Sequence, residues 1–145
     1  MPATKLYMNW TGVTVTPNGG SAINLTGVTD VSFNRSGTNK PFFGDNRQHA
    51  RAIRTTNQAR SVSISCGDLS ALDSVAIGTV CTVVGTLNDL HNGTGSGART
   101  YTAINAVLSS KPDGSSNDDY AGTTYSFDCF GSALDADPIS VVNAT

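Results

Sequence analysis

The sequence predicts a mainly β protein, a single-domain β-sandwich or barrel of about seven strands with one short flanking helix. Three observations predict this class. Residues that favour strands and turns dominate the 145 positions, with 18 Thr, 16 Ser, 12 Asn and 15 Gly, while the helix former glutamate is absent. Apolar and polar residues alternate with a period of two in several segments. Clusters of Gly, Pro, Asn and Asp separate these segments.

The N-terminal third is expected to supply two strands. In Lys5–Thr16 apolar residues alternate with polar ones, and the Thr11-Gly12 step interrupts the alternation, which indicates a bend. The segment Pro17–Gly20 is typical of a turn. Ile23–Asn34 resumes the alternation, so the second strand is expected there.

A long inter-strand loop is expected at Arg35–His49, because this segment is polar and shows no apolar alternation. Two strands should follow it, at Ala50–Thr56 and at Ala59–Cys66. In the latter, Val, Ile and Cys alternate with serine, which is typical of a strand with one buried face.

The flanking helix is expected at Asp68–Val75. Asp68 can accept hydrogen bonds from the free amides at the start of a helix, so it is the expected N-cap. Leu69, Leu72 and Val75 are three residues apart and would form its apolar face.

Polar loops are expected at Asn88–Ala98 and Lys111–Gly122. The sequence shows no partner for Asp135–Thr145, which is expected to be an extended C-terminal tail of a domain spanning residues 1–145. Three further strands are expected in this half of the chain, at Thr79–Leu87, Arg99–Ser109 and Thr123–Phe130.

The sequence predicts no catalytic, metal or cofactor site. The two histidines, His49 and His91, lie in or beside expected loops, and no Gly-x-Ser-x-Gly turn accompanies the serines. The three cysteines are widely spaced and odd in number, which favours free thiols over a zinc site or a disulfide framework. Gly93–Gly97 lacks the Gly-Lys-Ser/Thr of a phosphate-binding loop. We therefore expect a protein that is not an enzyme and uses no cofactor.

Charge is unevenly distributed along the chain. Residues 35–60 hold six basic residues and one acid, whereas the rest of the chain holds three bases and ten acids. Patches of opposite sign can join copies of a chain head to tail, and exposed phenylalanines can anchor such a contact. A solvated surface and a phosphate-binding patch for nucleic acid are the alternatives. The residues expected at contacts between subunits are Arg35, Lys40, Phe42, Phe43, Arg47, Arg51, Arg54, Asp118, Asp119, Asp135 and Asp137.

Several segments carry a resemblance to a known family through their order and spacing. They are Arg35–His49 with Phe42-Phe43-Gly44-Asp45, Ser61–Ser65 running into Gly67–Leu72, Gly78-Thr79 with Val80–Thr86, Ile104–Leu108, and Thr124–Phe130. Between Val28 and Phe130 the chain resembles the tail tube proteins of long-tailed bacteriophages and of the related gene transfer agents.

The resemblance implies a structural virion protein of the tail, assembled in the bacterial cytoplasm. Six copies would form a ring, inner strands of all copies would join into one barrel, and rings would stack into a tube through which DNA passes. Its partners would be copies of itself and other tail proteins, with DNA close by in the channel and no membrane. Family channels tend to be acidic, which here would need Asp128 or acidic loops.

Two other functions stay open from the sequence. The same β domain could decorate or cement a capsid, or act as an adhesive binding module of the particle. A small hydrolase that uses His49 or His91 is the third hypothesis, and replacing both histidines would test it.

Overall fold

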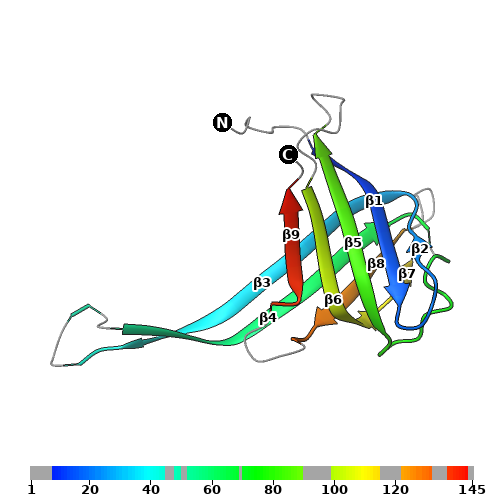
Figure 1. The fold of residues 1–145 in the computed structure, drawn as a ribbon. Coiled ribbons are helices and arrows are strands. Elements are labelled where there is room, and N and C mark those ends of the chain that lie inside the picture. Colours follow the sequence, from blue (N-terminus) through cyan, green and yellow to red (C-terminus); the bar gives the residue numbers. More distant parts are fainter. Residues whose placement is uncertain are drawn as a thin grey trace.

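Nine β-strands form the described part of the chain, which in this computed structural model comprises residues 8–44, 48–49, 52–68, 70–89, 99–114, 122–131 and 137–143 (Figure 1). The prediction of a mainly β protein is confirmed, and the described residues contain no helix. The strands are β1 (Met8–Pro17), β2 (Ile23–Asn24), β3 (Val28–Phe42), β4 (Ala52–Cys66), β5 (Val80–Asp89), β6 (Arg99–Ser110), β7 (Asp113–Gly114), β8 (Gly122–Cys129) and β9 (Ile139–Asn143).

These strands form one antiparallel sheet in the order β2-β1-β5-β6-β8-β4-β3, with β7 paired to β8 and β9 paired to β6. The sheet has β2 and β3 at its two ends, so it is open. The end strands β2 and β3 do not pair with each other, so the predicted barrel is not closed, and the strands belong to one sheet where the predicted sandwich would have two. The bend predicted at Thr11-Gly12 is confirmed by a shift in the β1–β5 register between Trp10 and Gly12.

The sheet branches at the middle of β6. Residues 99–103 of β6 pair with β9, whereas residues 106–110 pair with β8. Two residues of β6, Ile104 and Asn105, lie opposite one residue of β5, which is the pattern of a β-bulge. Asn105 has a φ of 54°, a left-handed conformation that asparagine tolerates better than most residues. The bulge lets β6 change its neighbour, because the Ile104 amide donates to Pro138 and the Asn105 carbonyl accepts from Phe130.

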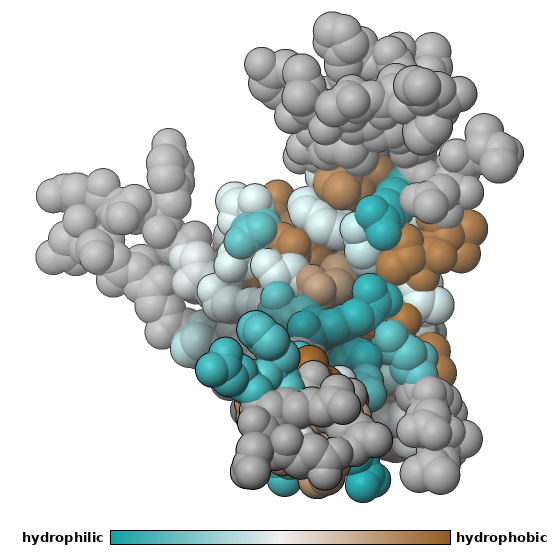
Figure 2. Space-filling view, turned by 90° about the vertical axis from the view of Figure 1, so that its left-hand side faces the viewer, coloured by the Kyte–Doolittle hydropathy of each residue, from teal (hydrophilic) through white to brown (hydrophobic). Residues whose placement is uncertain are grey.

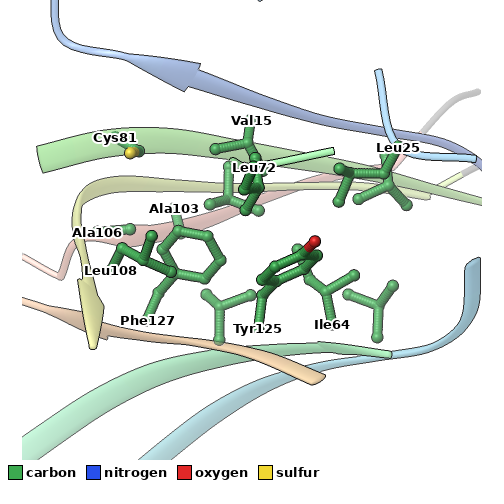
Figure 3. Close-up of a cluster of buried hydrophobic side chains, with 14 of the residues drawn as sticks. Val15, Leu25, Ile64, Leu72, Cys81, Ala103, Ala106, Leu108, Tyr125 and Phe127 are labelled. Atoms are coloured by element: carbon green, nitrogen blue, oxygen red, sulfur yellow. The ribbon is translucent and has the colours of Figure 1, made fainter. Parts of the chain in front are cut away.

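The core lies between two halves of the sheet that face each other. Figure 3 shows side chains from β1 and β5 meeting those from β4 and β8. The alternation predicted for the end of β4 is confirmed, because Val62, Ile64 and Cys66 are buried and the serines between them lie on the other face. The largest fully buried side chains are Tyr125, Phe127, Ile64, Leu72 and Leu108. Burial of each such apolar side chain contributes about 1.5–3 kcal/mol.

The helix predicted at Asp68–Val75 is wrong, because the described residues of this segment form turns. Asp68 does accept a hydrogen bond from the Ser70 amide at 3.0 Å, as expected of an N-cap. The amides of Asp73 and Val75 then bond to carbonyls three residues earlier, which is the spacing of turns. Lys111 Nζ donates to the carbonyls of Leu72 and Val75, and thereby satisfies groups that a longer helix would pair internally. Among the described residues we find no apolar helix with the length needed to cross a membrane.

The loop predicted at Arg35–His49 is also wrong over most of its length. β3 continues to Phe42, and it pairs with β4 from Val28 opposite Cys66 to Phe42 opposite Ala52. The two strands predicted at Ala50–Thr56 and Ala59–Cys66 are one strand, β4, interrupted by a bulge. The outer part of this hairpin is exposed on both faces, so its sequence lacks the apolar alternation that marks a half-buried strand.

The C-terminal residues find a partner that the sequence did not show. Ile139–Asn143 forms β9 and pairs with β6, from Ala103 opposite Ile139 to Arg99 opposite Asn143. Ile139 is buried in the core. Residues 139–143 of the predicted extended tail, Asp135–Thr145, therefore form an edge strand.

Gly85 is the position where a side chain would disturb the core most directly. A Cβ at this site would lie 2.9 Å from Trp10 Cζ3 and 3.4 Å from Phe33 Cε2. We expect Gly85→Ala to destabilise the fold by about 1–3 kcal/mol, because it overpacks this contact. The single tryptophan reports the change through its fluorescence. The matched control is Gly12→Ala, where nothing lies within 4 Å of the added carbon, and an equal loss of stability in both variants would contradict the expectation.

Candidate assembly surface

The outer part of the β3–β4 hairpin extends away from the rest of the molecule (Figure 1). We call residues 34–43, which are the outer part of β3 and the Phe43 that follows it, together with residues 52–59 of β4, the arm. β4 pairs with β8 only from Arg60 to Cys66, and β3 is the last strand of the sheet. The arm is thus a two-stranded ribbon with no other strand beside it among the described residues. Such ribbons are marginally stable alone, and their unpaired edges can accept another strand.

A bulge marks the root of the arm. Ser36 pairs with Ala59 and Thr38 with Thr56, so two residues of β4, Asn57 and Gln58, lie opposite Gly37. Asn57 has a φ of 53°. A β-bulge bends its strand and increases its twist, so this one sets the direction in which the arm leaves the sheet.

The end of the arm carries exposed apolar side chains. Phe42, Phe43 and Ile53 are exposed to 61%, 56% and 65% of their surface. The register places Pro41 and Ile53 opposite each other on one face, and Phe42 opposite Ala52 on the other. Exposed apolar groups gathered at one end of an element are typical of an interaction site.

Basic residues lie directly behind this apolar end. The register places Lys40 opposite Arg54, on the same face as Phe42. Like charges in opposite positions of two strands repel each other. The sequence of the arm contains no acidic residue to neutralise them. A surface with negative charge would therefore complement this face of the arm.

Figure 2 shows the molecule from the side on which the arm extends. Figure 2 shows hydrophilic residues across the middle of this face, with hydrophobic residues gathered toward the upper right.

At the root of the arm, Asp137 lies between two arginines that face each other across β3 and β4. Its carboxylate is 3.2 Å from Arg35 Nε and 3.1 Å from Arg60 Nε. The same carboxylate accepts the Ile139 amide at 2.9 Å. Partial desolvation raises the pKa of Asp137, but the Ile139 amide and the two arginines outweigh it and lower the pKa overall.

The lowered pKa of Asp137 predicts a loss of stability in acid. A carboxyl group whose pKa is lower in the folded state stabilises the fold above its unfolded pKa, and the contribution disappears as the pH falls through the folded value. We expect the difference in unfolding free energy between wild type and Asp137→Asn to shrink as the pH falls below the ordinary value of 3.8. Urea unfolding at several pH values measures this difference, and one that stays constant down to pH 2 would contradict the expectation.

The structure brings some of the predicted contact residues together. Lys40, Phe42, Phe43 and Arg54 lie toward the end of the arm, whereas Arg35, at its root, pairs with Asp137 of the same chain. The predicted contact residues Arg47, Arg51, Asp118, Asp119 and Asp135 lie outside the described residues.

Sequence reasoning missed Ile53 and Arg60 as parts of this region. Ile53 lies in a predicted strand, and only the tertiary structure reveals that its side chain is exposed. Arg60 has a signal in the sequence, because it continues the inward alternation of Val62, Ile64 and Cys66. A charged residue in such a position needs a partner of opposite charge.

A second surface lies on the outer face of β3, β4 and β8, the face opposite to the core. Its positions are small and polar, except for the exposed carboxylates Asp30 and Asp128, and no base occurs among them. The register defines this face by Asp30, Ser32, Asn34, Ser61, Ser63, Ser65, Thr124, Ser126 and Asp128.

The groups that could support chemistry are dispersed. The three cysteines are free, and burial raises the pKa of Cys66 and Cys81. Burial, together with Asp128 and Asp137, raises the pKa of Cys129 to about 11, so its reactive thiolate is scarce near pH 7. His49 is exposed, and His91 lies outside the described residues. Within the described part of the chain, no group of His, Cys and Asp side chains could hold a metal ion.

No protein-family model and no curated protein sequence matches the chain. Its fold is similar to that of a chain in the cryo-EM structure of the anti-feeding prophage baseplate, 6-fold symmetrised, with a TM-score of 0.58 and 12% identity over 98% of this chain and 96% of that chain. It is also similar to a chain of the anti-feeding prophage cap, which terminates the tube, with a TM-score of 0.54 and 12% identity over 99% and 96%. At this identity the likeness shows a shared fold.

Proposed function

We propose that the chain is a structural subunit of a phage-tail-like particle, and within it the tube subunit that forms stacked rings with copies of itself. The observation that carries the proposal is the arm, a ribbon with unpaired edges that ends in exposed Phe42, Phe43 and Ile53. The shared fold with chains of the anti-feeding prophage baseplate and cap supports a place in such a particle.

A neighbouring copy is the partner that this arm needs. Within the described residues no other strand pairs with the arm. A second molecule that pairs with its edges and buries its apolar end would therefore give a favourable free energy of association. The chain itself supplies suitable negative charge, because its sequence holds ten acids outside residues 35–60. Repetition of one such contact between identical subunits gives rings or filaments.

Rings of six copies around a channel are the arrangement we propose. The baseplate structure with a similar chain is 6-fold symmetrised, which supports this number. The outer face of β3, β4 and β8 suits a channel that DNA passes through, because small polar groups with Asp30 and Asp128 offer neither bases nor apolar groups to bind a polyanion. The chain acts by assembly in this proposal and carries out no catalysis.

Electron microscopy of the purified chain over a range of concentrations tests the proposal. We expect rings or short tubes, and light scattering should show a mass that rises with concentration. A strictly monomeric chain at high concentration and low salt would overturn the tube proposal. A monomer that binds preformed capsids would favour the decoration or adhesive module instead.

Charge reversal on the arm should weaken this assembly. Arg54→Glu places a negative charge opposite Lys40 and removes part of the positive face, so we expect the assembly threshold to rise by about tenfold, which corresponds to about 1.4 kcal/mol. Raising the salt concentration should weaken the wild type in the same direction, because salt screens exposed charges. Arg99→Glu, outside the arm, is the matched control. Equal thresholds for the wild type and Arg54→Glu would remove the electrostatic part of the proposal.

A further inference from the structure

Arg60 holds the bulge at the root of the arm together. Its Nη1 donates to the carbonyls of Ser36 and Ala59, at 3.3 and 3.0 Å, and its Nη2 donates to Gln58 Oε1 at 2.9 Å. One guanidinium group thus bonds to both strands beside the bulge. The Arg60 side chain is 15% exposed, whereas its partners Ser36, Gln58 and Ala59 are exposed.

Asp137 in turn holds Arg60. Its Oδ1 accepts from Arg60 Nε at 3.1 Å, and its Oδ2 lies 3.2 Å from Arg35 Nε. Arg35 also donates from Nη2 to the Ile139 carbonyl at 3.0 Å. The root of the arm is therefore bonded to the start of β9 through both arginines.

β9 itself is fixed to the body of the sheet. Five residue pairs join it to β6, and Ile139 is buried in the core. Asp137 is attached to this strand through the Ile139 amide. Bonds thus run without a break from the body, through β9 and Asp137, to Arg60 and the bulge.

We propose that Asp137 is a positioning residue that holds the arm in one direction relative to the body, so that the C-terminal strand sets where the arm points. Among the described residues, β8 ends its pairing with β4 at Arg60, so the bonds of Arg60 and Arg35 are what tie the root of the arm to β9. Without Asp137 the bulge keeps its strand pairing but loses the bond between Arg60 and β9. Only the bond from Arg35 to the Ile139 carbonyl then remains, so the arm can swing more widely about its root. This inference concerns the single chain and goes beyond the proposed assembly.

Distance measurements between two spin labels test the inference. Gln48→Cys places a label near the end of the arm, and Ser74→Cys places one on the body, since both positions are exposed. The raised pKa values of the native thiols favour labelling of the introduced ones. Dilution with unlabelled chain restricts the measured distances to those within one molecule. We expect one narrow distance distribution in the wild-type background and a distribution at least about twice as wide with Asp137→Ala.

The control variants separate positioning from stability. Asp30→Asn removes one exposed negative charge from β3 outside the network, and it should keep the narrow distribution. Arg35→Gln keeps the bond between Arg60 and Asp137, so an intermediate width is expected even if Asp137→Ala folds poorly. A residue that only stabilised the fold would lower the melting temperature and leave the width unchanged. Equally narrow distributions in wild type, Asp137→Ala and Arg35→Gln would overturn the inference, whether or not the chain assembles.

Discussion

Removing the arm is expected to abolish assembly and to leave a folded chain. The variant replaces residues 37–58 by Asn-Gly, so that the paired residues Ser36 and Ala59 flank a two-residue turn. The arm supplies none of the buried core side chains, so we expect the melting temperature to change by only a few degrees. Electron microscopy and light scattering should show a monomer even at about ten times the concentration at which the wild type assembles.

A milder variant separates the apolar end of the arm from its backbone. Phe42→Ser, Phe43→Ser and Ile53→Ser together remove the exposed apolar surface and keep the ribbon. We expect this triple variant to assemble weakly as well, because apolar anchors dominate the energy of most contacts between proteins. Full assembly of the variant without the arm would refute the proposed contact. Loss of folding in that variant would show that the arm contributes to the core.

Phe127→Ala is expected to cause the largest loss of stability of any single change considered. Phe127 is fully buried on β8, between the halves of the sheet (Figure 3). Truncating a buried phenylalanine leaves a cavity and costs about 3–5 kcal/mol. Domains of this size have about 5–15 kcal/mol of stability in total, so part of the variant population should be unfolded at 37 °C. Urea unfolding followed by circular dichroism measures the loss.

Phe130→Ala, three residues further along, is the matched control. Phe130 is 48% exposed and its removal opens no enclosed cavity, so we expect a loss below about 1 kcal/mol. Similar losses in the two variants would show that Phe127 does not pack in the core as described.

The strands with one buried face could be predicted from the sequence. In residues 61–66 of β4, apolar and serine residues alternate, and the tertiary structure buries the apolar set as the alternation requires. The bend after Trp10 was predicted for a similar local reason, since Thr11-Gly12 breaks the alternation where the β1–β5 register shifts. The absence of glutamate and the wealth of Thr, Ser, Asn and Gly also indicated a mainly β chain.

The arm and the turns at Asp68–Val75 could not be predicted in this way. An exposed strand needs no apolar alternation, so Arg35–Phe42 has the composition of a loop even though it pairs with β4 along its length. Asp68, Leu72 and Val75 have the spacing of a helix, but Lys111, distant in sequence, binds the carbonyls of Leu72 and Val75 and stabilises turns instead.

The sequence by itself determined the β class, the buried faces of the central strands and the basic charge of residues 35–60. These properties depend on each residue and its neighbours along the chain, so they can be predicted from the sequence. Only the tertiary structure decided that Asp137 meets Arg35 and Arg60, that β9 pairs with β6, and that the apolar end of the arm is left uncovered. These contacts are between residues that are far apart in the chain, and whether such residues meet in space depends on how the whole sheet bends.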